Sequence, residues 1–242
     1  MHPYGTPLLQ VVSGSVCTGC DTPESDKDYL GIFAAPTTDI LTFGPKFSSG
    51  VYKTGEDDVT WWEVRHAFDI LLRGNFNALP LLYSDYIEYT TPWGSLLRKN
   101  REAFISTRFV KSMLGYSKDQ LRRWEDGRTL RNASPEKAIA CVYRELLIAM
   151  RLSTDIPNFS LVLDEKQRQG FLDIKEGRTA LADTVKSLNR EYLAVEYLLK
   201  ESRLKREPEY ELVVQILKEI REQVPWDVEL HPEWKNLVGV TQ

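Results

Sequence analysis

The chain has 242 residues, of which 42% are hydrophobic and 27% are charged, and its formal net charge is −4 at pH 7. This composition is typical of folded globular proteins and excludes a chain that is disordered throughout. Because there is no run of about 18 apolar residues and no basic segment followed by an apolar stretch, we expect neither a membrane span nor a secretory signal, and we predict a cytoplasmic protein.

A run of apolar residues from Leu8 to Val12 predicts a buried strand near the start of the chain. Gly14 and Ser15 follow this run and predict a tight turn. Glycine lets the backbone approach a ligand closely, and exposed N–H groups beside a serine hydroxyl can hold anionic oxygens. We therefore expect this turn to bind phosphate.

Two carboxylates, Asp26 and Asp28, are separated by a single residue ahead of the apolar segment Tyr29–Phe33. We expect both to lie on a second strand, where residues two apart point to the same face. Like charges on one face repel unless a cation lies between them. Mg²⁺ is typically bound by one or two carboxylates together with substrate phosphates, so a metal site is predicted here. The alternative is that this D-x-D pattern is the solvated end of a strand.

Cys17 and Cys20 form a C-x-x-C pattern in the loop between the two predicted strands. Such a pattern could indicate redox chemistry or half of a zinc site, but a closed zinc site needs two more ligands. No spacing supplies them from the remaining Cys and His residues, which are Cys141, His2, His66 and His231. We expect both cysteines to line the loop after the Gly-Ser turn.

The next elements complete a small mixed sheet. Pro36–Gly50 is rich in Thr, Gly, Pro and Ser and predicts an irregular excursion. An extended segment from Asp57 to Trp62 should then lead into a helix over Glu63–Arg73, which Gly74 ends.

The chain beyond about residue 90 shows helical periodicity almost throughout. Capping residues and apolar spacing predict helices that run from Thr91-Pro92 through Phe104, from a cap at Ser117, from Ser134-Pro135 toward Leu152, from Thr179 to Arg203 and from Pro208 to Gln223, with a packed tail from Pro225. We therefore predict an α/β (α+β) fold, with a mixed-sheet core over residues 1–95 and a helical domain over residues 96–242.

Charge is unevenly distributed along the chain. Residues 1–97 contain 5 Lys and Arg against 12 Asp and Glu, residues 98–151 contain 13 against 6, and residues 152–242 contain 13 against 17. The middle segment is therefore +7, which suits a phosphate-bearing or polyanionic partner beside an acidic site. The alternative for each single cation is a solvated helix face.

Within the basic segment, several cations surround an aromatic residue that could stack on a base. These candidate acceptor-binding residues are Arg108, Lys111, Tyr116, Arg122 and Arg123. Lys137 and Arg144 lie seven residues apart, which places them on one face of the predicted helix and lets them neutralise triphosphate charge.

The order Gly14-Ser15, loop, Ser25-Asp26-x-Asp28-x-x-Gly31-Ile32-Phe33 resembles the nucleotidyltransferase signature of the DNA polymerase β superfamily. Within that superfamily, the chain resembles a group of predicted nucleotidyltransferases associated with RNA repair. The resemblance covers most of residues 8 to 200 and includes later matches at Asp58-Val59, Glu63-Val64-Arg65, Leu71-Leu72-x-Gly74-Asn75-x-Asn77, Gly115-Tyr116-Ser117, Gln120-Leu121, Lys137-Ala138 and Ile174-Lys175-x-Gly177.

This resemblance implies an enzyme that uses a divalent metal, Mg²⁺ or alternatively Mn²⁺, and a nucleoside triphosphate such as ATP. It implies that the catalytic carboxylates and metal ligands are Asp26, Asp28 and Asp58, with Asp57 and Glu63 as alternatives for the third. The implied nucleotide-binding residues are Gly14, Ser15, Ser25, Lys137 and Arg144, of which Lys137 is the stronger match in its pair.

The expected reaction transfers a nucleoside monophosphate to an acceptor hydroxyl and releases pyrophosphate. The resemblance favours an RNA 3′ end as acceptor. The alternatives are transfer to a protein or small molecule, and a non-catalytic nucleotide-binding regulatory protein. The helical half could also serve as the surface of a homo-oligomer.

Overall fold

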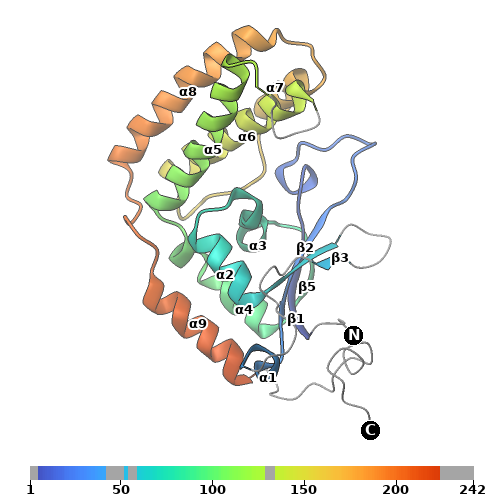
Figure 1. The fold of residues 1–242 in the computed structure, drawn as a ribbon, viewed down its shortest axis with the longest axis vertical. Helices are drawn as coiled ribbons and strands as arrows, with labels where there is room; N and C mark the ends of the chain where they lie inside the picture. Colours follow the sequence, from blue (N-terminus) through green and yellow to red (C-terminus); the bar gives the residue numbers. More distant parts are fainter. Residues whose placement is uncertain (1–4, 42–51, 54–58, 129–133, 224–242) are drawn as a thin grey trace.

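A computed structural model of the protein describes residues 5–41, 52–53, 59–128 and 134–223 (Figure 1). The described strands form one mixed sheet in the order β3-β4-β2-β1-β5. Strands β2 and β4 are parallel, and the other neighbouring pairs are antiparallel. The predicted α+β fold, a small sheet followed by helices, is confirmed. The strand bounds are β1 (Thr6–Val12), β2 (Tyr29–Ala34), β3 (Tyr52–Lys53), β4 (Val59–Glu63) and β5 (Ile87–Thr90).

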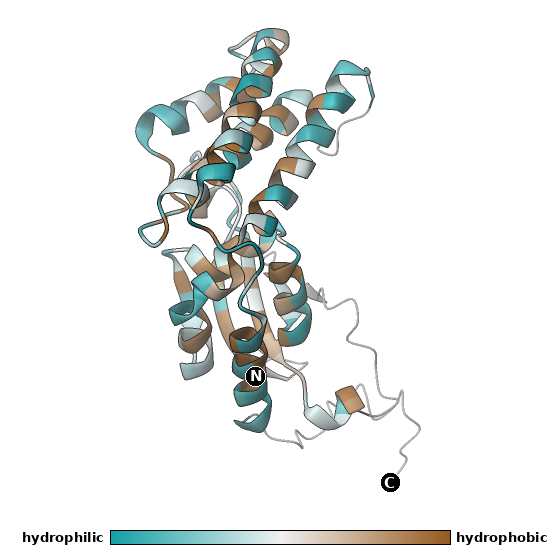
Figure 2. Ribbon diagram, turned by 90° about the vertical axis from the view of Figure 1, so that its left-hand side faces the viewer, coloured by the Kyte–Doolittle hydropathy of each residue, from teal (hydrophilic) through white to brown (hydrophobic). Residues whose placement is uncertain are grey.

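The helices that pack on the strands of this sheet include α2 (Val64–Leu72), α3 (Leu79–Tyr83) and α4 (Pro92–Lys99). Hydrophobic residues gather on the sheet and between the helices (Figure 2), and the core includes buried Leu9 and Ile32 from the strands. This burial explains why the apolar segments of the first half form strands and short amphipathic helices around one core.

Several predicted boundaries in the first half are confirmed and others differ. Helix α2 follows Glu63, whose carboxylate caps it, and Gly74 follows its end with φ +73°. Thr91 caps α4 as predicted, but α4 ends at Lys99 and a separate 3-10 helix covers Arg101–Phe104, so the helix expected through Phe104 is broken in two. The irregular excursion expected after Pro36 contains a short helix, α1 (Thr37–Leu41).

The helical half packs around α6 (Pro135–Thr154), which contacts α5 (Thr107–Glu125), α7 (Glu165–Lys175) and α8 (Leu181–Glu201). Ser134 caps α6 as predicted. The cap predicted at Ser117 is wrong, because Ser117 is buried in the middle of α5, whose N-cap is Ser106. Helix α5 runs past Gly115 because the apolar face on both sides of this glycine is buried against the core.

The last described helix, α9 (Tyr210–Gln223), returns to the sheet half and packs against α2 and α4 (Figure 1). Arg221 donates to the carbonyl oxygen of Ala35 at 2.8 Å and forms an ion pair with the buried carboxylate of Glu63. Elements on both sides of residue 95 therefore share one interface, and the domain boundary at that residue stays a prediction. The tail expected from Pro225 lies outside the described residues.

None of the helices in the described part of the chain has the length and apolar character needed to cross a membrane.

Candidate active site

A pocket of about 300 Å³ lies where β1 ends and β2 and β4 begin, at the junction of the sheet and the helical half. We call it the strand-end pocket. It brings residues of the Gly-Ser turn and the D-x-D pattern together with one residue of α6. Its lining comprises Ser13, Gly14, Cys17, Thr18, Asp28, Tyr29, Leu30, Thr60, Trp62, Phe76, Asn77, Pro80, Arg144 and Leu161.

Gly14 and Asp28 are in close contact in this pocket. Gly14 has φ +68°, and a Cβ atom at this position would lie 2.4 Å from Oδ2 of Asp28. The backbone N–H of Ser13 donates to the carbonyl oxygen of Asp28 at 2.8 Å. Glycine is therefore required here both for the backbone conformation and for the approach of the carboxylate.

The helical half holds the loop that carries these residues. The backbone N–H of Leu163 donates to the carbonyl oxygen of Thr18 at 3.0 Å, and Arg168 donates to the carbonyl oxygen of Asp21 at 3.0 Å. The loop between β1 and β2 is thus fixed from both halves of the molecule.

The prediction that both carboxylates lie on a strand is wrong, because β2 begins at Tyr29. Strand β1 ends at Val12 and the chain turns at Gly14, so pairing beyond Tyr29 is limited to the hydrogen bond from Ser13 to Asp28 and does not reach Asp26. Asp28 lines the strand-end pocket, whereas Asp26 is exposed and is not part of its lining. The spacing of two residues therefore does not by itself place the two carboxylates on one face.

The third carboxylate cannot be placed, because Asp57 and Asp58 lie outside the described residues. Val59, the residue after Asp58 in the sequence, pairs with Tyr29, the residue after Asp28. The other alternative, Glu63, is paired with Arg221 at the far end of β4. Within the described ranges no cluster of three or more His, Cys, Asp or Glu side chains is arranged to hold a metal ion.

Two N–H donors of residues that line this pocket are buried without a hydrogen-bond partner in the described part of the chain. They are Nε of Arg144 and the indole Nε1 of Trp62. The guanidinium of Arg144 lies 5.5 Å from the ring centroids of both Phe76 and Phe171. Buried donors are normally satisfied in folded proteins, so these two are suited to bind acceptor atoms of a ligand.

The remaining predicted nucleotide-binding residues, Ser15, Ser25 and Lys137, are not part of the pocket lining. The carbonyl oxygen of Ser15 accepts from the backbone N–H of Cys20 at 2.9 Å. The hydroxyl of Ser25 accepts from the backbone N–H of Thr22 at 2.9 Å. Lys137 is exposed in the first turn of α6, two turns from Arg144.

The cysteines line the loop as predicted. The thiol of Cys17 donates to the carbonyl oxygen of Gly14 at 3.3 Å, and both Cys17 and Cys20 are free and buried. Burial raises the pKa of Cys17 to about 12 and also raises the pKa of Cys20. A thiol that stays protonated is a poor nucleophile and a poor metal ligand, which argues against redox or zinc chemistry at this pair.

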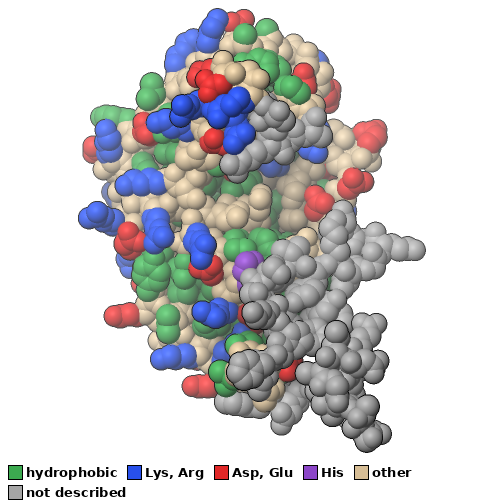
Figure 3. All heavy atoms as spheres, in the orientation of Figure 1, with side chains coloured by type: hydrophobic (Ala, Val, Ile, Leu, Met, Phe, Trp, Pro, Cys, Tyr) green, Lys and Arg blue, Asp and Glu red, His purple; other side chains and the backbone are tan. Residues whose placement is uncertain are grey.

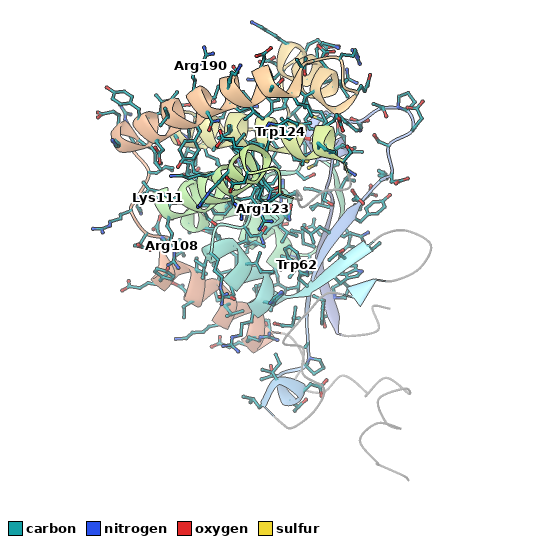
Figure 4. The ribbon with its side chains drawn as sticks, turned by 45° about the horizontal axis from the view of Figure 1, so that its top comes forward. Trp62, Arg108, Lys111, Arg123, Trp124 and Arg190 are labelled. Carbon is teal, nitrogen blue, oxygen red and sulfur yellow. The ribbon has the colours of Figure 1, made fainter. Side chains whose placement is uncertain are left out.

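The candidate acceptor-binding residues lie along α5 but contact different parts of the molecule. Arg108 donates to the hydroxyl of Tyr210 at 2.8 Å, Lys111 lines a separate cavity between α5 and α8, and Arg122 lies 3.7 Å from Asp126. Figure 4 shows Arg108 and Lys111 near one end of α5 and Arg123 farther along it. Lys and Arg side chains on the face seen in Figure 3 are interspersed with acidic ones.

Tyr116 differs from the rest of this set because it lines a cavity that shares residues with the strand-end pocket. The structure therefore brings together Gly14, Asp28 and Arg144 directly, with Tyr116 nearby. It separates Arg108, Lys111 and Arg122 from them.

Thr60, Trp62 and Asn77 are among the pocket-lining residues that were not predicted as site residues from the sequence. Thr60 and Trp62 alternate on β4, and a buried tryptophan in a strand normally indicates core packing. Asn77 belongs to a segment that resembles the family, but nothing in its spacing indicated a ligand contact.

Comparisons with known proteins identify the family of the chain. The family model described as "RNA repair pathway DNA polymerase beta family" (RlaP) matches residues 6–205. A crystal structure of a nucleotidyltransferase-like protein from Exiguobacterium sibiricum is similar at 16% sequence identity and a TM-score of 0.28, covering 99% of this chain and 82% of that one. The search of curated proteins found no match. Because the family model spans most of the sequence, the chain belongs to the RNA repair pathway DNA polymerase beta family.

Proposed function

We propose that this protein is a metal-dependent nucleotidyltransferase that transfers a nucleoside monophosphate from a nucleoside triphosphate to the 3′ hydroxyl of an RNA. Family membership indicates a polymerase β-like nucleotidyltransferase. The observation that carries the finer proposal is the contact of Gly14 with the Asp28 carboxylate in a pocket that also contains Arg144.

The strand-end pocket has the groups that a bound triphosphate needs. Phosphate oxygens would bind at the turn of Ser13 and Gly14, beside the Asp28 carboxylate that the missing side chain of Gly14 admits. Arg144, also in the lining, would offset phosphate charge, and its Nε and the indole N–H of Trp62 are donors that a ligand could use. Asp28 would be repelled by phosphate unless a cation lies between the two.

Asp28, the one carboxylate in the described pocket lining, is the type of ligand that a divalent cation such as Mg²⁺ takes. Hard cations prefer carboxylate and phosphate oxygens, and Mg²⁺ usually takes one or two carboxylates together with substrate phosphates. Asp28 would hold it from the pocket wall, and Asp26 and Asp58 are proposed to complete the set. When bound, the ion would neutralise charge on the phosphates of the triphosphate.

The protein's own residues then position the reaction. The acceptor hydroxyl oxygen attacks the α-phosphorus, the bond from that phosphorus to the bridging oxygen breaks, and pyrophosphate leaves. The Gly14 turn would hold the leaving pyrophosphate, and Arg144 would stabilise its charge. Asp58 is proposed to accept the proton of the attacking hydroxyl. Phosphoryl transfer depends mainly on such positioning and electrostatic stabilisation.

The proposal is tested by incubating the purified protein with Mg²⁺ and each α-labelled nucleoside triphosphate, with and without bulk tRNA. We expect label on the RNA. Label on the protein instead would move the acceptor to a polypeptide and leave the metal chemistry in place.

The variant Asp28→Asn should lose at least about a hundredfold in transfer rate, because loss of one preorganised electrostatic group at a reacting centre costs about that much. Asp183→Asn is the matched control, since Asp183 is exposed on α8 and lines none of the cavities described here. Full transfer by Asp28→Asn would refute the assignment of this carboxylate. The variant Arg144→Gln should weaken triphosphate binding, with exposed Arg190→Gln on α8 as its control.

A further inference from the structure

A second cavity of about 490 Å³ adjoins the strand-end pocket. It lies between α5, α6 and the segment Arg73–Asn77, and we call it the interhelix pocket. Phe76, Asn77 and Arg144 line both cavities. The two cavities therefore meet at these three residues, where a ligand with phosphates in the first would place a neighbouring ring in the second. The volume is within the range of small-molecule sites.

The interhelix pocket offers flat surfaces. Tyr116 and Phe76 contribute aromatic rings, and Arg144 contributes a guanidinium plane that is already positioned over Phe76. Unpaired nucleobases are commonly bound by stacking on aromatic side chains and on arginine planes.

The wall of this cavity also contains a buried acid, Glu145, which is 6% exposed. The hydroxyl of Ser117 lies 3.3 Å from its Oε2. Burial raises the pKa of Glu145 to about 8, so the carboxyl group is protonated at neutral pH. Its O–H group can then donate one hydrogen bond, and its oxygen atoms can still accept. A neutral donor and acceptor pair matches the edge of a nucleobase better than it matches a phosphate.

The other polar groups agree with a neutral ring as ligand. Arg73 is paired with Asp69 at 2.9 Å, so its charge is partly offset. The Oδ1 of Asn75 accepts from the backbone N–H of Asn77 at 2.9 Å, which leaves the amide NH₂ group of Asn75 to act as a donor at the mouth.

We propose that the interhelix pocket binds a nucleobase, stacked against Tyr116 and Phe76 and hydrogen-bonded along its edge by Glu145. This inference rests on the proposed function, because it takes the strand-end pocket to hold the phosphates. The base belongs either to the nucleoside triphosphate or to the terminal nucleotide of the acceptor RNA, and the experiment separates these two sources.

The test fills the pocket from its rim with Ser112→Trp, since Ser112 is exposed on α5 and lines the cavity. The matched control is Ser187→Trp, at an exposed serine of α8 that lines none of the described cavities. Equilibrium binding to the full chain is measured for four probes: a nucleoside triphosphate, inorganic triphosphate, a short RNA, and the same RNA with an abasic 3′ terminal nucleotide.

If the base comes from the triphosphate, Ser112→Trp should weaken nucleoside triphosphate binding about tenfold, the scale of one lost stacking interaction, and leave inorganic triphosphate binding unchanged. If it comes from the acceptor, the variant should bind both RNAs equally, whereas the wild type prefers the intact end. Glu145→Met, which removes the polar groups of the side chain at similar size, is the second variant and should lose about fivefold for the base-bearing probe only.

Wild-type-like binding of all four probes by both pocket variants would overturn the inference, and so would the failure of the wild type to bind any base-bearing probe better than its base-free counterpart. Failure of the proposed function has a different result. In that case no label is transferred, while the base-dependent binding and its loss in Ser112→Trp are still observed.

Discussion

Replacing Glu145 by glutamine should make the stability of the protein less dependent on pH. The carboxyl group is buried, and its pKa of about 8 lies above the ordinary value of 4.5 because burial disfavours the charged form. Between these two values the native state holds a proton that the unfolded state has released. The contribution of this group to stability is therefore complete below pH 4.5 and is lost as the pH rises toward 8.

The size of this effect follows from linkage. Each pH unit within that window lowers the free energy of unfolding by about 1.4 kcal/mol, so raising the pH from 5.5 to 7.5 removes about 2.7 kcal/mol. Glutamine does not titrate and keeps an oxygen that can accept from Ser117. Between pH 5.5 and 7.5, the free energy of unfolding of the variant should therefore rise by about 2.7 kcal/mol relative to that of the wild type.

Urea denaturation at pH 5.5, 6.5 and 7.5 measures this difference, provided that the slope against denaturant stays the same in both proteins. Glu211→Gln is the control, because Glu211 is exposed on α9. Parallel stability profiles for the wild type and Glu145→Gln would mean that the Glu145 carboxyl group is not protonated in the folded protein, and would refute the reasoning.

Three further predictions concern other parts of the structure. Gly14→Ala should abolish transfer and cost about 1–2 kcal/mol in urea denaturation, because its φ is positive and the new methyl group would overlap the Asp28 carboxylate; unchanged activity would contradict the close approach. Arg221→Ala should destabilise the protein by about 3 kcal/mol, because it leaves the Glu63 carboxylate buried without its partner, and Glu63→Gln in the same chain should recover part of that loss. Cys17 should resist iodoacetamide at pH 8 until the protein is denatured, since its raised pKa keeps the thiol protonated; rapid labelling of the folded protein, seen by mass spectrometry, would show that the thiol is accessible and ionised.

The sequence was most informative where local chemistry determines structure. The turn at Gly14 could be predicted because glycine has a conformational role there, and the cap at Ser134 because a serine before proline starts a helix. Both features depend on a few adjacent residues.

Features that depend on distant parts of the chain could not be predicted. The spacing of Asp26 and Asp28 predicted that both lie on a strand. A strand needs a neighbouring strand to pair with, and β1, the neighbour of β2, ends at Val12, so β2 begins only at Tyr29. The sequence around Ser117 predicted a helix N-cap, but the helix continues through this residue. Packing against α6 and α8 buries α5 on both sides of Ser117, and this packing is not visible in the local sequence.

The candidate site divides in the same way. Asp28 and Arg144 could be proposed from the sequence because each belongs to a recognisable pattern. The indole N–H of Trp62 became a candidate only when the fold left it buried without a partner in the described residues. Likewise, only the fold shows that Phe76 lines two neighbouring cavities.

The ion pair between Glu63 and Arg221 also bears on how the protein is made. The two residues are 158 positions apart, so a growing chain presents Glu63 long before its partner exists. At about 5–20 residues per second, translation would take roughly 10–30 s to cover that distance. During this interval the carboxylate of Glu63, between β4 and α2, is without the Arg221 guanidinium and must stay hydrated or protonated. The sheet is thus synthesised well before α9 but cannot reach its final packing until Arg221 has been translated.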